Sequence, residues 1–190
     1  KIFIFLGNIY KSEGDSATAL STIQKGRTMH PSDNSLVIEE LNMYLYSGKD
    51  KEALESLNLA IQGDPNNANL YFAQGTVHDK IGKKDMAATS YKKAIEIKPD
   101  YFDAYYNLGA MYFNEAAEMA NKANELKSNT EYAKAKEKFE ARFKESEPYL
   151  EKALELNPND TNTMMSLKQL YARLNENDKY DKLKAKMGGK

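Results

Sequence analysis

The chain has 190 residues, of which 41% are hydrophobic and 29% are charged, as expected of a folded protein with a large wetted surface. Its formal net charge of −1 provides no overall basic field, so we expect no nucleic-acid partner. Cysteine is absent, which excludes disulfide bonds, zinc–thiolate sites and a cysteine nucleophile, and no apolar run reaches the roughly 18 residues of a membrane span.

Prolines mark a unit that repeats along the chain. Pro31, Pro65 and Pro99 are evenly spaced, with a period of about 34 residues, and Pro158 follows after one such unit and an insertion of about 25 residues. Self-similarity at this period is the sequence signature of a helical solenoid. Numbering the residues of each unit places position 1 at residues 34, 68, 102 and 161, and Lys1 at position 2 of the first unit.

Three features of the unit predict a helix, a turn and a second helix. Small residues at positions 8, 20 and 27 allow two helices to approach closely, and larger apolar residues at positions 4, 7, 11 and 24 fill the space between them at helical spacing. Glycine at position 15 adopts the left-handed conformation that ends a helix, and proline at position 32 stops the second helix. The glycines at position 15 are Gly14, Gly48 and Gly82.

The unit at 68–101 shows the pattern most clearly, and the other units depart from it locally. Glu40 stands at position 7, where an apolar residue is expected, and His78 stands at position 11, where the other units have tyrosine. We interpret His78 as a packing residue that replaces a ring.

The fourth unit carries the insertion, and its position 15 is Ala116 instead of glycine. The residues after Ala116 favour helix as far as about 128–129, and apolar residues at helical spacing resume near 130. We therefore expect both helices of this unit to be lengthened by about 12 residues each, which makes a prong of roughly 18 Å. Pro148 falls within the second of these helices. The fifth unit has a charged second helix, typical of a terminal cap.

These positions resemble the pattern of the tetratricopeptide repeat (TPR) family, which has a large residue at 4, Gly or Ala at 8, Tyr at 11, Ala at 20 and 27, and Pro at 32. Four units match well and a fifth matches in part, so the resemblance covers nearly the whole chain. It implies an all-α fold, a right-handed superhelical solenoid of helix–turn–helix repeats that forms a single domain over residues 1–190. The expected repeats are about 1–33, 34–67, 68–101, 102–160 and 161–187.

In TPR proteins the first helices line a concave groove, mainly through positions 2, 5, 9, 12 and 13, and the resemblance implies a scaffold that binds a peptide or protein segment there. On this chain, position 5 is apolar or aromatic throughout and position 9 is mostly polar. That combination suits an extended or helical peptide, although the position-5 residues would also serve to pack adjacent first helices. The expected ligand-binding groove comprises Ile4, Asn8, Ile38, Asn42, Tyr46, Phe72, Thr76, Tyr106 and Phe113.

A TPR subclass that grips a terminal carboxylate matches this chain only in part. Its two asparagines at position 9 are present as Asn8 and Asn42, but its cations are replaced by Ile4, Phe72 and Thr76. Without those charges an anionic tail has little to pair with, so we reject this interpretation.

Two other classes of function are less well supported. Ile2, Phe3, Phe5 and Leu6 form an apolar N-terminal edge, and this edge or the prong of the fourth repeat would suit a structural or self-assembly module. An enzyme is not expected, because the sequence contains no nucleophile–base pair, metal cluster or phosphate-binding glycine pattern. We therefore expect no catalytic residue, no cofactor and no metal.

The chain begins inside a repeat, so we expect it to be part of a longer protein. The long fourth repeat also resembles that of some exported bacterial TPR proteins, which would imply a bacterial origin and a periplasmic or exported location. A cytoplasmic location is the alternative, and the sequence does not identify the partner.

Overall fold

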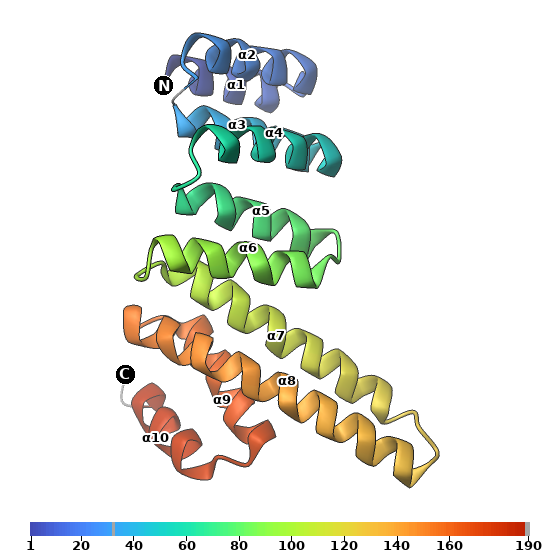
Figure 1. Cartoon of the computed structure of the whole chain (residues 1–190). Helices are drawn as coiled ribbons and strands as arrows, with labels where there is room; N and C mark the ends of the chain where they lie inside the picture. Colours follow the sequence, from blue (N-terminus) through green and yellow to red (C-terminus); the bar gives the residue numbers. More distant parts are fainter. Residues whose placement is uncertain (32, 189–190) are drawn as a thin grey trace. The chain divides into compact units, whose positions relative to one another are not determined.

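The computed structural model describes residues 1–31 and 33–188, and divides the chain into two compact units, Lys1–Ile97 and Lys98–Lys190. Every regular element in the described residues is an α-helix, as expected (Figure 1). No helix in this part of the chain is long and apolar enough to cross a lipid bilayer.

The first unit consists of three helix pairs, one for each of the first three repeats (Figure 1). Each pair packs on itself, and the second helix of one pair packs against the first helix of the next. The first helices also touch one another, α1 against α3 and α3 against α5. The six helices are α1 (Ile2–Ser12), α2 (Ser16–Met29), α3 (Asn34–Tyr46), α4 (Asp50–Gly63), α5 (Ala68–Lys80) and α6 (Lys84–Ile97).

Glycines and prolines end these helices as predicted. Gly14, Gly48 and Gly82 have φ values of 83°, 68° and 76°, in the left-handed region that favours glycine. The second helices α2, α4 and α6 each end two residues before the proline at position 32. These two signals therefore set the boundaries of the first three repeats.

Side chains cap two of the first helices, and a third first helix has no such cap. The Asp33 carboxylate accepts a hydrogen bond from Ser35 N (3.0 Å), and the Asn67 side chain accepts one from Asn69 N (3.1 Å). The next first helix has Tyr101 as its N-cap residue, without a side-chain hydrogen bond, so Asp100 does not cap it.

Glu40 is buried in a polar contact between the first and second repeats. It forms an ion pair with Arg27 of α2, and its carboxylate also accepts hydrogen bonds from Gln24 Nε2 (3.2 Å) and Ser56 Oγ (3.1 Å). These donors satisfy a charge that would otherwise be costly to bury. The carboxylate therefore links helices α2, α3 and α4.

The equivalent position of the third repeat forms the same link with a neutral residue. Gln74 donates to Asn58 Oδ1 of α4 (2.9 Å) and accepts from Ser90 Oγ of α6 (2.8 Å). Gln74 lies one repeat after Glu40, and Asn58 and Ser90 lie one repeat after Gln24 and Ser56. In the second and third repeats, the side chain at position 7 therefore hydrogen-bonds both to the preceding second helix and to the second helix of its own repeat.

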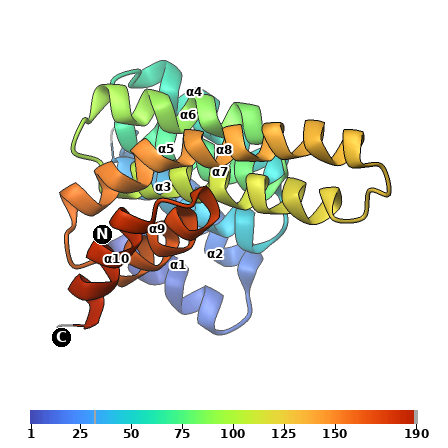
Figure 2. The ribbon, with the colours of Figure 1, turned by 90° about the horizontal axis from the view of Figure 1, so that it is seen from below.

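The second unit contains the fourth and fifth repeats, in helices α7 (Phe102–Ala123), α8 (Asn129–Leu156), α9 (Thr161–Leu174) and α10 (Asn177–Gly188). Helices α7 and α8 have 22 and 28 residues, which confirms the predicted lengthening of both helices. Their far ends and the loop that joins them extend past α9 and α10 (Figures 1 and 2). Pro148 lies inside α8, as predicted.

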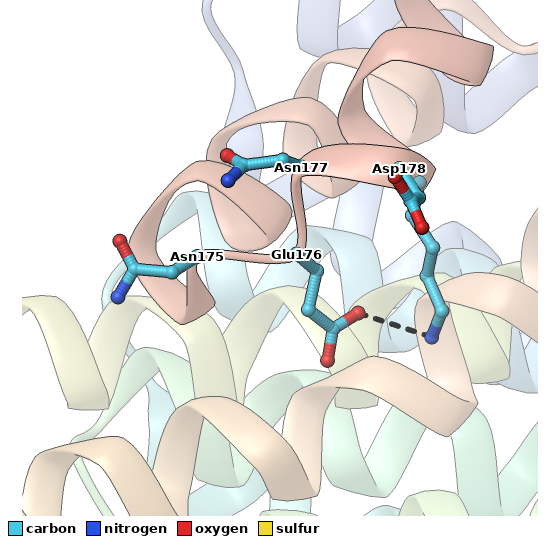
Figure 3. A pocket seen from close by; sticks show the side chains of 5 residues that line it. Asn175, Glu176, Asn177 and Asp178 are labelled. Atoms are coloured by element: carbon cyan, nitrogen blue, oxygen red, sulfur yellow. Dashed lines mark ion pairs between the residues drawn. The ribbon is translucent and has the colours of Figure 1, made fainter.

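A network of charges joins α8 to the start of α10. The Lys179 ammonium pairs with three carboxylates, those of Glu147, Glu151 (3.0 Å) and Glu176 (3.1 Å), and Figure 3 shows the last of these pairs. Burial raises the pKa of the Glu147 carboxyl above its usual value, and the hydrogen bonds that Lys179 donates to these carboxylates raise its own pKa. The charge of Lys179 is therefore fully engaged within the protein.

Candidate functional site

The expected binding residues are distributed over both units. Seven of them lie on first helices of the first unit, and we call these seven the first-helix surface. The remaining two, Tyr106 and Phe113, lie on α7 in the second unit. The first-helix surface comprises Ile4 and Asn8 on α1, Ile38, Asn42 and Tyr46 on α3, and Phe72 and Thr76 on α5.

The apolar residues at position 5 are partly buried and form the floor of this surface. Ile38 packs against the apolar core of α3, α4 and α5, and the Phe72 ring lies 5.8 Å from the Tyr91 ring between centroids. Ile4 is also partly buried on α1. Packing therefore buries part of the surface of each of these side chains, and the rest of that surface is accessible to solvent.

Tyr46 is the most exposed large apolar residue of the first-helix surface. Its side chain is 70% exposed, and the Lys11 ammonium of α1 lies 5.0 Å from its ring centroid. A cation over a ring face is attracted to the ring quadrupole and limits the directions the ring can take. Lys11 is at position 12 and Tyr46 at position 13, so a comparison of adjacent first helices would have identified this contact from the sequence.

The polar residues at position 9 differ in how much hydrogen-bonding capacity they retain. The Asn8 amide is exposed and has no hydrogen bond to any other described residue, and Asn42 Nδ2 donates only weakly to Glu39 Oε2 (3.4 Å). Thr76 Oγ1 instead donates to the Phe72 carbonyl (3.1 Å) and accepts from Tyr91 OH (3.4 Å). The two asparagines therefore retain more unused hydrogen-bonding capacity than Thr76 does.

Lys80, the last residue of α5, contacts the preceding repeat in a way that the sequence did not predict. Its ammonium donates to the Leu45 carbonyl of α3 (3.2 Å) and to Asp50 Oδ1 of α4 (2.7 Å). Lys80 stands at position 13 of the third repeat, the position of Tyr46 in the second. The contact ties the end of α5 to the preceding helix pair.

In the second unit, both expected binding residues pack into aromatic clusters. The Tyr106 ring stacks on Phe102 with 6.1 Å between centroids, and Phe113 lies 5.3 Å from the buried Phe143. Both side chains are partly buried against the core of α7, α8 and α9. They offer less accessible area than Tyr46 does.

His78, the chain's one buried histidine among the described residues, serves packing. Burial lowers the pKa of its imidazole below the usual value, and the nearby Lys83 charge lowers it further. Its Nδ1 atom has no hydrogen-bond partner among the described residues. Within those residues, no three His, Asp or Glu side chains are arranged to hold a metal ion.

Comparison with known proteins identifies the repeat. Residues 80–115 match a family model described as TPR repeat, and residues 138–160 match one described as tetratricopeptide repeat. A crystal structure of MamA protein aligns over 96% of this chain and 87% of its own, with a TM-score of 0.68 and 21% identity, and so shares the fold. The chain therefore contains tetratricopeptide repeats at these residues and shares the fold of a TPR solenoid. Its helices form the TPR class of helical solenoid, whose repeats serve as protein–protein interaction scaffolds.

Two curated relatives are much longer than this chain. Anaphase-promoting complex subunit 3 of Schizosaccharomyces pombe is 32% identical over 71 residues, which is 37% of this chain and 11% of that protein. Cellulose synthase operon protein C of Pseudomonas fluorescens is 27% identical over 134 residues, or 66% of this chain and 10% of that protein. The matches thus span about a tenth of these relatives. Because they come from a fungus and a bacterium, the expected bacterial origin stays a prediction.

Proposed function

We propose that this chain binds a peptide or protein segment along the first-helix surface, as part of a protein-interaction scaffold. The observation that supports the proposal is an exposed ring together with two exposed amides, one without a hydrogen bond among the described residues and one with a single long one. Tyr46 supplies the ring, and Asn8 and Asn42 supply the amides. Tyr106 and Phe113 on α7 are proposed as binding residues of the second unit, considered by itself.

The chemistry of this surface suits a bound backbone with apolar side chains. An asparagine side chain has both a carbonyl acceptor and an amide donor, so it can satisfy a peptide unit of the ligand in both directions. Tyrosine offers a large contact area at little conformational cost, which is why it is frequent among residues that dominate interfaces. Ile38 and Phe72 would then contact the ligand's apolar side chains from below.

Selection from a library of displayed random peptides tests this proposal. Peptides enriched on the immobilised chain are retested as synthetic peptides against the Tyr46→Ala variant, and we expect dissociation constants at least tenfold higher than with the unchanged chain. Leu59→Ala and Met86→Ala are matched controls, because Leu59 and Met86 are exposed apolar residues on the second helices α4 and α6. Equal loss of binding in the controls would contradict the proposal.

The second candidate is a self-assembly module that uses the N-terminal edge. Ile2 and Ile9 are 66% and 37% exposed, whereas their equivalents one repeat later, Leu36 and Met43, are 1% and 2% exposed. In α3 that face is covered by α2, the second helix of the preceding repeat. The equivalent apolar face of α1 is uncovered within the described residues, which favours association through it. The prong of α7 and α8 is the other element of this candidate, with Leu126 and Tyr132 exposed near its end.

A further inference from the structure

A hollow of about 370 Å³ lies between the last two helices, α9 and α10. Its walls are mainly apolar, and Met165 contributes a side chain that is 45% exposed. Lys168 and Gln169 supply the polar part of the lining. The remaining lining residues are Ala172 of α9 and Tyr180 and Met187 of α10.

The hollow lies where the fifth repeat has large residues at positions that are mostly small in the other helix pairs. In the fourth repeat, Gly109 of α7 lies so close to Leu150 of α8 that an added Cβ would be 2.7 Å from Leu150 Cγ. The Ser146 hydroxyl also donates to the Gly109 carbonyl (2.9 Å). The equivalents of the small residues at positions 8, 20 and 27 are Lys168, Tyr180 and Met187, and all three line the hollow.

A positive charge lies beside the apolar walls. The Lys168 ammonium is 5.7 Å from the Tyr180 ring centroid, and no carboxylate among the described residues pairs with it. Lys179, by contrast, is engaged by three carboxylates. Residues 161–188, which form α9, α10 and the turn between them, contain six cationic side chains and three carboxylates. This end of the chain is therefore positively charged, although the whole chain has a net charge of −1.

We propose that this hollow binds an apolar side chain of an acidic peptide segment. The apolar walls take a side chain such as leucine, and Met165 and Met187 can adapt to its shape because methionine is flexible. The Lys168 ammonium pairs with a carboxylate next to that side chain in the peptide. The inference rests on the proposed function, because it too assumes a peptide as the partner. The site is a different one, since the hollow shares no residue with the first-helix surface.

Charge argues against a further helix pair as the occupant. In the other repeats an apolar residue stands at position 24 of the second helix, whereas the fifth repeat has the exposed Lys184 there. Lys168 likewise replaces a glycine or leucine at position 8. A helix that covered the hollow would have to bury the Lys168 ammonium in its lining, whereas an acidic peptide would neutralise it.

Fluorescence anisotropy with a labelled peptide tests the inference. The probe is a nonapeptide of aspartate and glutamate with one central leucine, titrated with the whole chain at low salt. Ala172→Phe fills the hollow from an exposed helix position, and we expect it to raise the dissociation constant at least tenfold. Ala133→Phe, at an exposed position near the start of α8, is the matched control and should bind as the unchanged chain does.

Changes in the probe give a readout that does not depend on the folding of any variant. Replacing the leucine by alanine should weaken binding about tenfold, and replacing the acidic residues by their amides should weaken it further while removing its salt dependence. No binding of the leucine probe at about 1 mM chain, or equal binding of the alanine probe, would overturn the inference. If the chain binds no peptide but forms a dimer that Ala172→Phe dissociates, the hollow is a contact between two copies of the chain. That result would also overturn the inference.

These outcomes are separable from those of the proposed function. Tyr46→Ala should leave binding of the acidic probe unchanged, because Tyr46 is not part of the hollow. Loss of the acidic probe in both Tyr46→Ala and Ala172→Phe would contradict the inference of a distinct site.

Discussion

At the scale of single residues, Glu40 shows how a departure from the repeat pattern is accommodated. The pattern calls for an apolar residue at position 7, and the chain places there a buried carboxylate with donors from α2 and α4. A buried ion pair need not make the fold more stable than apolar residues of similar size would. Removing one partner is destabilising, however, because it leaves the charge of the other buried and unpaired.

A double-mutant comparison tests this interpretation of Glu40. We expect Glu40→Ala to lower the free energy of unfolding by about 2–3 kcal/mol, because Arg27 and Ser56 lose their acceptor. Replacing both members of the pair, in Arg27→Met with Glu40→Leu, should recover most of that loss. Urea denaturation followed by circular dichroism measures both, and a double variant at least as unstable as Glu40→Ala would contradict the interpretation.

His78 makes stability depend on pH in a predictable direction. Its pKa is lower in the folded chain than the usual 6.5, so below that pH the unfolded chain binds more protons and stability falls as the pH falls. The variant His78→Tyr introduces the tyrosine that the other repeats have at position 11. Between pH 7 and pH 5 its free energy of unfolding should fall less than that of the unchanged chain. Denaturation at several pH values measures this, with a tyrosine at the exposed His30 as the matched control. Parallel pH profiles for the chain and for His78→Tyr would contradict the prediction.

At the scale of helices, close approach depends on small residues at defined positions. A Cβ atom at Gly109 would lie 2.7 Å from Leu150 Cγ and 3.0 Å from Leu150 N, so α7 and α8 would have to separate. A Cβ at Gly63, the last residue of α4, would meet no atom within 4 Å.

These two glycines give a matched pair of substitutions. Gly109→Ala should lower the free energy of unfolding by about 1–3 kcal/mol, because it overpacks the contact of α7 with α8. Gly63→Ala should raise it by up to about 1 kcal/mol, since alanine loses less backbone entropy than glycine on folding into a helix. Chemical denaturation of both variants checks this, and a shift of the same sign in the two would count against the packing argument.

At the scale of the whole molecule, the repeat period predicts most of the architecture. The regular spacing, the glycines at position 15 and the prolines at position 32 set the helix boundaries, and Ala116 at position 15 correctly signals the long helices α7 and α8. The sequence pattern did not predict the hydrogen bonds that Glu40 and Gln74 make to neighbouring helices, although these residues and their serine partners, Ser56 and Ser90, recur one repeat apart. A pattern of apolar and small residues does not report which polar side chains meet in three dimensions.

The binding residues are less predictable than the fold, because exposure depends on neighbours. The sequence left open how far the position-5 side chains pack between helices, and the structure shows that Ile38 and Phe72 are each partly buried by packing. Position 9 was expected to be polar, but the Thr76 hydroxyl is used within its own helix. Asn8, Asn42 and Tyr46 are exposed, and they are the residues on which the proposed binding depends.

The apolar edge of α1 makes a prediction about association. If that edge pairs chains, Ile2→Lys with Ile9→Lys should shift the sedimentation of the chain toward a monomer, because each charge would be buried at the contact. Leu59→Lys, a change at an exposed apolar residue on α4, is the matched control. A chain that already sediments as a monomer at high concentration would contradict self-assembly through this edge.

The most direct test of binding at the first-helix surface is a nuclear magnetic resonance titration with a selected peptide. The side-chain amides of Asn8 and Asn42 give their own signals, and both are expected to shift as the peptide is added. The side-chain amide of Gln62, exposed on the second helix α4, is expected to stay in place. Shifts at Gln62 with unchanged signals for Asn8 and Asn42 would show that the peptide binds elsewhere and would contradict the central claim.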